Sequence, residues 1–482
     1  MKKNNLILLL VIIIVGSFLR FYKLNYQSLW LDELVTMTVV DLPTVADVLK
    51  ITTDADIHPP GFYILLHYWI KTFGNTETQL KMISVIAGIL SIISIYFFAK
   101  KLFSWKEGLI SAAILSVAWF PIYYSQEARA YSLLLFCSML SVMFYWEIFQ
   151  KFYFDKPLKI INVIFYVLSI IVLTYIHYFG LYLVGLEGLG LLIIATYRKK
   201  YFKELIQIYL IPVLIYIPWL PLMKMQFLGD DGQHMKAPDF EQIFLFTKFI
   251  FNDSKPILLF HFLLTVVLIT KISKSENWKI SKILRELSIE TKFVLIWCLV
   301  PLFLILLISQ VKPVFSFRNM LIIYAAVPIL LSRLITTSIK KDLYQLALAS
   351  LIIIVLLFNL LITKGYYTTK TKEQFREATE YVVNENRNLN DAEVLAYTYA
   401  PDFFNFYFDK FNSKIKVDHF IHISFTEEKV KTEIAQCNSE YLWLIYAHDV
   451  PNETIMNSLQ SKYSEIKSES FVDANTKLFK KK

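Results

Sequence analysis

Charged residues are scarce in this sequence. They make up 18% of its 482 residues, whereas hydrophobic residues make up 56%. A soluble domain cannot cover so much apolar surface with its own polar side chains. Lipid must therefore solvate most of the chain, which excludes an ordinary soluble protein.

Cysteine and repeated segments are also lacking. The three cysteines are Cys137, Cys298 and Cys437, and the first two fall in long apolar runs. Only one thiol is left for the polar C-terminal part, so no disulfide can form within it. No internal repeat is visible, so the inverted halves of many transporters are not evident.

A secretory signal is not favoured at the N-terminus. The apolar run from Leu6 to Phe18 follows two lysines, as in a signal peptide, but no small-residue cleavage site comes after it. Arg20, Tyr22 and Tyr26 follow instead, and we expect them to anchor the end of a membrane helix at the interface. The run is therefore interpreted as the first span.

Long apolar runs recur from Leu6 to Thr363 and stop after Lys364. Runs of about 18 or more residues can cross a hydrocarbon core of roughly 30 Å. We expect about eleven spans, near residues 5–20, 79–99, 108–124, 131–149, 160–178, 180–197, 205–223, 256–271, 292–310, 319–337 and 343–363.

The net charge of +9 is informative through its distribution. Lysines and arginines gather in alternate connections, beginning with Lys2 and Lys3, whereas Asp32, Glu33 and other acids fall in the opposite ones. Basic residues mark the cytoplasmic side. We expect a multi-pass plasma-membrane protein that contacts membrane lipids and no nucleic acid, with its N-terminus in the cytoplasm and its C-terminal part outside.

The pattern predicts a polytopic α-helical membrane protein with a small C-terminal extracytoplasmic α/β domain. Residues 1–363 would form the membrane domain, with a first outer loop at 21–78 that contains its own surface helices, and residues 364–482 the outer domain. In the outer domain, helices are expected at 373–386 and 427–436 and strands at 394–399 and 441–446. It has no phosphate-binding glycine pattern and no metal-ligand spacing.

Two adjacent acids follow Trp30 just outside the first span. Neighbouring residues on a helix do not share a face, so Asp32 or Glu33 can point into a cavity while the other binds a backbone amide or a basic group. A transferase that activates an acceptor hydroxyl needs one such carboxylate as a base. The alternative is that Asp32 only caps a surface helix.

A second polar group lies before Pro59-Pro60, at a predicted helix start. Asp56 and His58 stand there, and the exposed amides of a helix start favour anions, so His58 could help to hold a phosphate. The alternative is a well-built helix entrance with a solvated histidine. Asp and His would also allow a divalent cation, but their spacing matches no specific ligand set, so metal dependence stays open.

A third group, from Tyr124 to Ser132, joins two spans at their outer ends. If it is helical, Gln126 neighbours Arg129 and Glu127 neighbours Tyr131. An arginine on a side that should lack positive charge is interpreted as a clamp on a phosphate oxygen or as the partner of Glu127. The alternative is a surface ion pair beneath an aromatic belt.

A further outer arginine, Arg318, lies beside the tenth span. Its bidentate guanidinium suits the phosphate of a lipid-linked donor, and the alternative is ordinary snorkelling. His177, with Tyr175 and Tyr178, ends the fifth span and is interpreted as a belt residue.

These motifs resemble those of the GT-C type membrane glycosyltransferases, specifically the protein O-mannosyltransferase and aminoarabinose transferase group, glycosyltransferase family 39. The resemblance covers roughly residues 1–335 and lies in the acidic pair after Trp30, in the segment from Asp56 to Tyr63, and in the segment from Tyr124 to Ser132. Near Arg318 the sequence departs from the group, because Asn319 stands where a tyrosine is expected.

The resemblance implies a polyprenyl-phosphate-linked sugar as the donor and a hydroxyl on a protein, glycan or lipid as the acceptor, with inversion at the anomeric carbon. Asp32 would be the base, with Glu33 beside it. A polyprenyl phosphate leaves as a stable anion, so Arg129 and Arg318 would matter more than a general acid. The runner-up function is a transporter or flippase of lipid-linked intermediates, for which Glu187 is the main intramembrane candidate. A third is a scaffold without catalysis.

Overall fold

A computed structural model describes residues 3–482 except 56–57, 229–235, 257, 260–261, 264, 267–285 and 390. The chain divides into two compact units. The first consists of Met1–Tyr22, Pro43–Gly74 and Gln79–Gly365, and the second of Lys23–Leu42, Asn75–Thr78 and Tyr366–Lys482. The predicted domain boundary between residues 363 and 364 stays a prediction.

The first unit is a bundle of apolar helices. Among the described residues, eight helices are long and apolar enough to cross a membrane, and a bent pair makes a ninth span if it is counted as one. The main helices are α1 (Lys3–Phe21), α5 (Glu77–Leu102), α6 (Trp105–Val117), α7 (Trp119–Ser125), α8 (Tyr131–Phe154), α9 (Ile160–Ile176), α10 (Tyr178–Arg198), α11 (Phe202–Tyr216), α12 (Leu220–Leu228), α13 (Phe240–Ile250), α16 (Ile289–Ile308), α17 (Leu321–Tyr324), α18 (Ala326–Ser338) and α19 (Asp342–Phe358).

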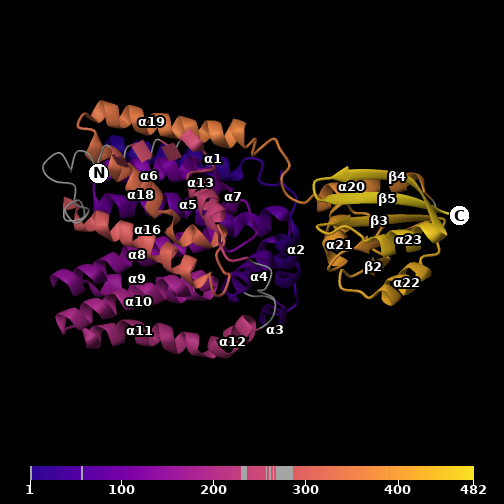
Figure 1. The fold of residues 1–482 in the computed structure, drawn as a ribbon, viewed down its shortest axis with the longest axis horizontal. Helices are drawn as coiled ribbons and strands as arrows, with labels where there is room; N and C mark the ends of the chain where they lie inside the picture. The colour runs from indigo at the N-terminus through magenta and orange to yellow at the C-terminus, as the bar shows by residue number, and fades with distance from the viewer. Residues whose placement is uncertain are drawn as a thin grey trace. The chain divides into compact units, whose positions relative to one another are not determined.

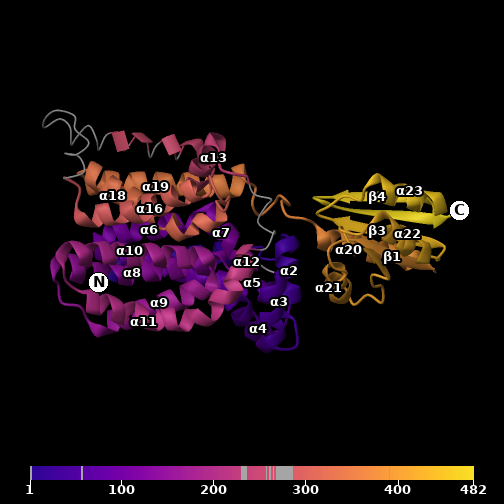
Figure 2. The same cartoon turned by 60° about the horizontal axis from the view of Figure 1, so that its bottom comes forward.

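The prediction of a multi-pass helical membrane protein is confirmed. Ten of the eleven predicted spans coincide with apolar helices, although α9 has only 17 residues. The predicted span at 256–271 falls on a segment of which only scattered residues are described. Helices α8, α9, α10 and α11 lie side by side (Figures 1 and 2). The outward faces of α9, α10 and α11 are rich in exposed leucine and isoleucine, as expected of surfaces in lipid.

The span predicted at 108–124 is broken rather than continuous. Helices α6 and α7 meet at 60° around Ala118, which has an extended backbone. Pro121 explains the break, because it has no N–H for the carbonyl of Val117 and its ring would clash with that carbonyl in a continuous helix.

Arg20 stabilises this break, and its expected role as an interfacial anchor is wrong. Its side chain is fully buried, and its guanidinium donates to the carbonyls of Leu115 and Ser116 at 3.3 and 3.1 Å and to Ser125 Oγ at 3.2 Å. A broken helix leaves carbonyl groups without their usual partners, and in lipid such groups must be satisfied within the protein. Arg20 of α1 is thus hydrogen-bonded to both sides of the bend between α6 and α7.

The segment predicted as the first outer loop contains three helices, α2 (Leu31–Val40), α3 (Val45–Ala55) and α4 (Gly61–Phe73). Helices α2 and α4 match those expected near Asp32 and Pro59-Pro60. Helix α2 belongs to the second unit, whereas α3 and α4 belong to the first.

The second unit contains a mixed five-stranded sheet with helices on both faces. Its strands are β1 (Ala392–Tyr397), β2 (His419–Ile421), β3 (Tyr441–Ala447), β4 (Tyr463–Phe471) and β5 (Ala474–Lys481), in the order β2-β1-β3-β5-β4. Its helices are α20 (Phe375–Glu385), α21 (Asp402–Lys410), α22 (Glu427–Gln436) and α23 (Glu453–Lys462). Strand β1 is parallel to β2 and β3, and β5 is antiparallel to β3 and β4.

Strand β3 is buried on both faces, which explains its nearly continuous apolar sequence. Leu442 and Leu444 face a core that includes residues of α22 and α23, two helices that pack side by side (Figure 1). Trp443 points to the opposite face and contacts Tyr381 of α20. The predicted small α/β domain is therefore confirmed, and its four predicted elements match α20, β1, α22 and β3.

Candidate active site

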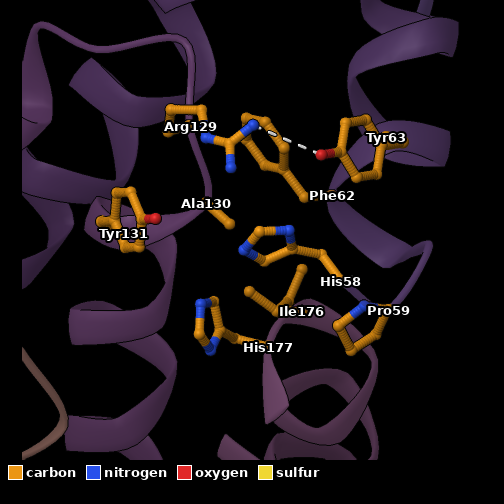
Figure 3. Close-up of a pocket in the computed structure, with 9 residues that line it drawn as sticks. All are labelled: His58, Pro59, Phe62, Tyr63, Arg129, Ala130, Tyr131, Ile176 and His177. Atoms are coloured by element: carbon orange, nitrogen blue, oxygen red, sulfur yellow. Dashed lines mark hydrogen bonds between the residues drawn. The ribbon is translucent and has the colours of Figure 1, made fainter. Parts of the chain in front are cut away.

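A small pocket in the first unit gathers residues from three separate segments (Figure 3). Residues 58–63 around the start of α4 form one side, and residues 129–131 before and at the start of α8 form another. Residues 176–177, at the end of α9 and just after it, close the pocket. Its lining consists of His58, Pro59, Phe62, Tyr63, Arg129, Ala130, Tyr131, Ile176 and His177. Two of the three motifs predicted to carry function therefore meet in one place.

A glycine allows the first side of the pocket to form. A Cβ atom at Gly61 would lie 2.5 Å from the carbonyl oxygen of Tyr175, a backbone atom that cannot move aside easily. The start of α4 therefore packs directly against the end of α9. This close approach brings His58 near His177, with 5.3 Å between their ring centroids.

The segment from Gln126 to Ala130 is a non-helical connection, so the helical pairing predicted for it is wrong. Helix α7 ends at Ser125, and Gln126 then turns back to cap α1: its Nε2 donates to the carbonyls of Arg20 and Tyr22 at 2.9 and 3.0 Å. Substrate contact by Gln126 stays a prediction. Glu127 is fully buried in this connection.

Arg129 and Tyr131 face the pocket from the second side. Ser84 of α5 donates to the backbone carbonyl of Arg129 at 2.9 Å, and the Arg129 guanidinium donates to the hydroxyl of Tyr63 at 3.4 Å (Figure 3). Only 6% of Arg129 is exposed, which is not the snorkelling geometry of an interfacial arginine. A buried guanidinium at a pocket can make bidentate contacts to an anionic oxygen pair.

The structure brings Arg318 to the same residues. Its guanidinium carbon lies 5.4 Å from the ring centroid of Tyr131, a cation–π distance. Arg318 therefore lies against a residue of the pocket that Arg129 also lines, although 189 positions separate the two arginines in the sequence.

His177 was not among the predicted site residues, yet it lines the pocket. Its backbone is extended, and its Nδ1 accepts a hydrogen bond from the Phe179 amide at 3.1 Å, so the ring caps the start of α10. In the neutral ring the proton then lies on Nε2. The sequence signal was a polar residue immediately after a 17-residue apolar helix, which a belt residue also gives.

The acidic pair belongs to the second unit, in the first turn of α2. Glu33 is fully buried, and its carboxylate accepts a hydrogen bond from the Lys372 ammonium at 2.9 Å. Asp32 is half-buried, and its backbone carbonyl accepts a hydrogen bond from Thr36. The two acids thus have different surroundings, as expected of neighbours on a helix.

C-terminal residues of the second unit hold the stretch that leads to this pair. Gln27 donates to the carbonyl of Thr369 at 2.8 Å and accepts from the amide of Thr371 at 3.0 Å. The hydroxyl of Tyr407 accepts from the amide of Leu29 at 3.0 Å, and Glu373 accepts from the amide of Leu31 at 2.8 Å. The backbone before Asp32 is therefore fixed by the segment around α20 and by α21.

Of the remaining predicted site residues, Asp56 lies outside the described residues. No pocket or bond assigns a catalytic role to Asp32 or Glu33 directly, and the roles of all nine predicted residues stay predictions. What the structure adds is the grouping of His58, Arg129 and Tyr131 in one pocket, with Arg318 against Tyr131.

One family model matches this chain. Residues 57–222 match the family described as dolichyl-phosphate-mannose-protein mannosyltransferase, which is about one third of the chain. The matched region contains every residue that lines the pocket. No curated protein sequence matches the chain.

Several solved structures have a similar fold, among them two that contain a lipid phosphate. One is the crystal structure of ArnT from Cupriavidus metallidurans bound to undecaprenyl phosphate, with a TM-score of 0.60, 11% identity, and coverage of 99% of this chain and 98% of that chain. The other is the archaeal oligosaccharyltransferase AglB from Archaeoglobus fulgidus in complex with an inhibitory peptide and a dolichol-phosphate, with a TM-score of 0.51, 11% identity, and coverage of 99% and 74%. The resemblance to GT-C type glycosyltransferases is confirmed at the level of the fold.

Proposed function

We propose that this chain is a membrane glycosyltransferase that transfers a sugar from a polyprenyl-phosphate-linked donor to a hydroxyl acceptor, with inversion at the anomeric carbon. The observation that carries the proposal is the pocket in which a buried arginine, Arg129, and His58 meet, because these two residues come from motifs expected to bind a phosphate. The family match over the same residues supports it.

The donor phosphate would be bound by Arg129 and Arg318. As the sugar is transferred, the bond between the anomeric carbon and the phosphate oxygen breaks, and negative charge develops on the departing phosphate. Guanidinium groups already in place stabilise that charge without needing a proton donor. His58, at the start of α4, would add a polar contact to the phosphate.

Asp32 would be the base that takes the proton of the acceptor hydroxyl. Glu33 is less suited to that task, because it is fully buried and already paired with Lys372. In this interpretation Glu33 and Lys372 hold the turn that presents Asp32. Gln126, Glu127, Tyr131 and Asp56 would contribute further contacts to the substrate.

The similar structures support a lipid-phosphate donor. ArnT was solved with undecaprenyl phosphate, and AglB with a dolichol-phosphate and an inhibitory peptide. By analogy the donor here would carry a polyprenyl chain dissolved in the membrane, and the acceptor would be a protein, a glycan or another lipid.

The reaction would take place on the outer face of a plasma membrane, with the N-terminus in the cytoplasm and residues 364–482 outside. The distribution of basic residues between alternate connections supports this orientation. The transporter alternative is not favoured, because the family match and both similar folds are those of sugar transferases.

The experiment that tests the proposal measures sugar transfer in membranes containing the wild-type chain or Asp32→Asn, with a panel of radiolabelled polyprenyl-phosphate sugars. The substitution keeps the shape of the side chain and removes its charge. We expect the wild type to consume at least one donor and the variant to consume none, while both insert in equal amounts.

Two results would count against the proposal in different ways. Equal consumption by both proteins would remove Asp32 from catalysis and leave the transferase function standing. A wild type that consumes no donor of the panel, but moves lipid-linked sugar between leaflets, would support the transporter instead. Lys414→Met, a change at an exposed side chain of the second unit, is the matched control for expression and insertion.

A further inference from the structure

The second unit contains a cluster of three side chains with the chemistry of metal ligands. Glu393 in β1, His419 at the start of β2 and Cys437 after α22 each offer one ligand atom, and these atoms all lie within 4.8 Å of one another. Among the described residues, this is the one such group of three. It was invisible in the sequence, because 44 positions separate its first and last members.

The fold explains why the three residues meet. Glu393 and Leu395 point to the same face of β1, and Leu395 pairs with His419 in the parallel strand β2. Helix α22 covers this face and ends at Gln436, which places Cys437 over the amino-terminal ends of the two strands. The cluster is therefore built by two strands and a helix end.

The distances suit a small tetrahedral ion. Ligands of Zn²⁺ lie about 2.0–2.3 Å from the metal, which places them about 3.3–3.8 Å from one another. His419 Nε2 already lies 3.7 Å from Glu393 Oε2. The other separations, none above 4.8 Å, can close by small side-chain rotations.

The surroundings orient the ligands and leave a path for entry. The backbone amides of Asn438 and Ser439 donate to the Glu393 carboxylate at 2.9 and 3.4 Å, and such hydrogen bonds hold a ligating carboxylate in a fixed orientation. The thiol of Cys437 is buried, whereas 17% of the His419 side chain and 25% of the Glu393 side chain are exposed. An ion can therefore reach the cluster from the side of the histidine and the carboxylate.

We propose that Glu393, His419 and Cys437 form a binding site for Zn²⁺. A thiolate, an imidazole and a carboxylate together match the ligand preference of zinc, whereas calcium and magnesium prefer oxygen ligands alone. Three protein ligands leave a fourth position for water. The bound ion would connect β1, β2 and the end of α22, so we expect it to stabilise the second unit. This proposal does not depend on the proposed transferase function.

The test uses the full chain purified in detergent and freed of metal with a chelator. Co²⁺ replaces Zn²⁺ as the probe, because its bond to a thiolate gives a charge-transfer absorption band in the near ultraviolet. We expect the band to appear at one equivalent of Co²⁺, to disappear when one equivalent of Zn²⁺ is added, and to be absent in Cys437→Ala and His419→Gln. Binding of Zn²⁺ should also raise the melting temperature of the wild type.

Cys137 in α8 and Cys298 in α16 are buried thiols of the first unit and serve as controls. Cys137→Ala and Cys298→Ala should keep the full band. His419→Gln changes a partly exposed side chain, so it tests the site even if Cys437→Ala fails to fold. A wild type that gives no band, or a band that survives in both Cys437→Ala and His419→Gln, would overturn the proposal.

Discussion

The ammonium of Lys372 lies 2.9 Å from a carboxylate oxygen of Glu33, and both side chains are almost completely buried, with 4% and 0% exposed. Lys372 stands just before α20 of the outer domain, and Glu33 lies in the first turn of α2, beside Asp32. Removing one member of a buried ion pair leaves the other charge buried without a compensating charge, which is costly. The pair therefore makes the position of Asp32 depend on the C-terminal part of the second unit.

Lys372→Met should destabilise the protein by about 3–5 kcal/mol, the usual cost of breaking a buried ion pair from one side. The melting temperature in detergent measures this effect. Glu33→Gln combined with Lys372→Met removes both charges, so the double variant should recover a large part of the loss.

The exposed Lys414→Met is the matched control, since it removes a lysine of the same unit from a solvated position. It should leave the melting temperature nearly unchanged. If Lys372→Met lowered the melting temperature no more than Lys414→Met does, the ion pair would not fix the turn that carries Asp32.

Much of the fold could be predicted because its signals are local. A long apolar run is sufficient to predict a span, and the alternation of helices and strands after residue 364 predicted an α/β domain. The break between α6 and α7 was also local, since Pro121 stands in the middle of the predicted span, but an apolar run does not reveal a bend. The weakly apolar strands β4 and β5 gave no signal, because their side chains are largely polar.

The candidate site could be predicted in its parts but not in its assembly. His58 was identified from its place at a helix start, and Arg129 and Arg318 from their positions at span ends. No pattern in the sequence indicates that His58, Arg129 and Tyr131 line one pocket or that Arg318 lies against the Tyr131 ring. His177 was missed as a pocket residue because a belt residue has the same sequence signature. The dependence of α2 on Lys372 and Glu373 was hidden by more than 330 residues of intervening chain.

Arg129→Lys tests whether the pocket binds an anion through a guanidinium fork. Lysine keeps the charge but loses the two parallel donors that match a phosphate, so transfer should fall by about 10²-fold, similar to the loss of one donor in an oxyanion site. The assay is initial-rate sugar transfer from a polyprenyl-phosphate sugar at several donor concentrations.

Arg333→Lys is the matched control for this change, because Arg333 contacts Glu107 and the Phe103 ring, and neither of these residues lines the pocket. Its transfer rate should stay close to that of the wild type. Equal rates for Arg129→Lys and the wild type would contradict a phosphate-binding fork at this position.

Gly61→Ala tests the close approach that forms the first side of the pocket. The added Cβ would lie 2.5 Å from the Tyr175 carbonyl oxygen, so α4 must move away from the end of α9. We expect a destabilisation of about 1–3 kcal/mol and a lower transfer rate, because His58 moves with the start of the helix. Gly185→Ala is the control, since its Cβ would meet nothing within 4 Å, and it should leave both quantities unchanged or raise stability slightly.

Glu377 gives a prediction for the pH dependence of the second unit. Burial acts to raise the pKa of this carboxyl group, but Arg376 and Lys370, each 2.8 Å away, more than offset burial and hold the pKa below its ordinary value of 4.5. A carboxyl group with a lowered folded-state pKa adds stability above its unfolded pKa, and this stability is lost as the pH falls through the folded value. Glu377→Gln should therefore cost about 2 kcal/mol near neutral pH.

Melting temperatures of the wild type and Glu377→Gln, compared from neutral pH downwards, measure this dependence. The difference between them should be constant near neutral pH and should shrink once the pH falls below the ordinary carboxyl pKa, because the unfolded wild-type chain then binds a proton that the folded Glu377 does not yet bind. The difference is lost fully when the pH falls below the lowered folded-state pKa and the folded group is protonated as well. Glu428→Gln changes an exposed glutamate of α22 and should show no comparable difference at any pH. A difference between Glu377→Gln and the wild type that widened on acidification would have the wrong sign and would exclude Glu377 as a group that stabilises this unit in its ionised form.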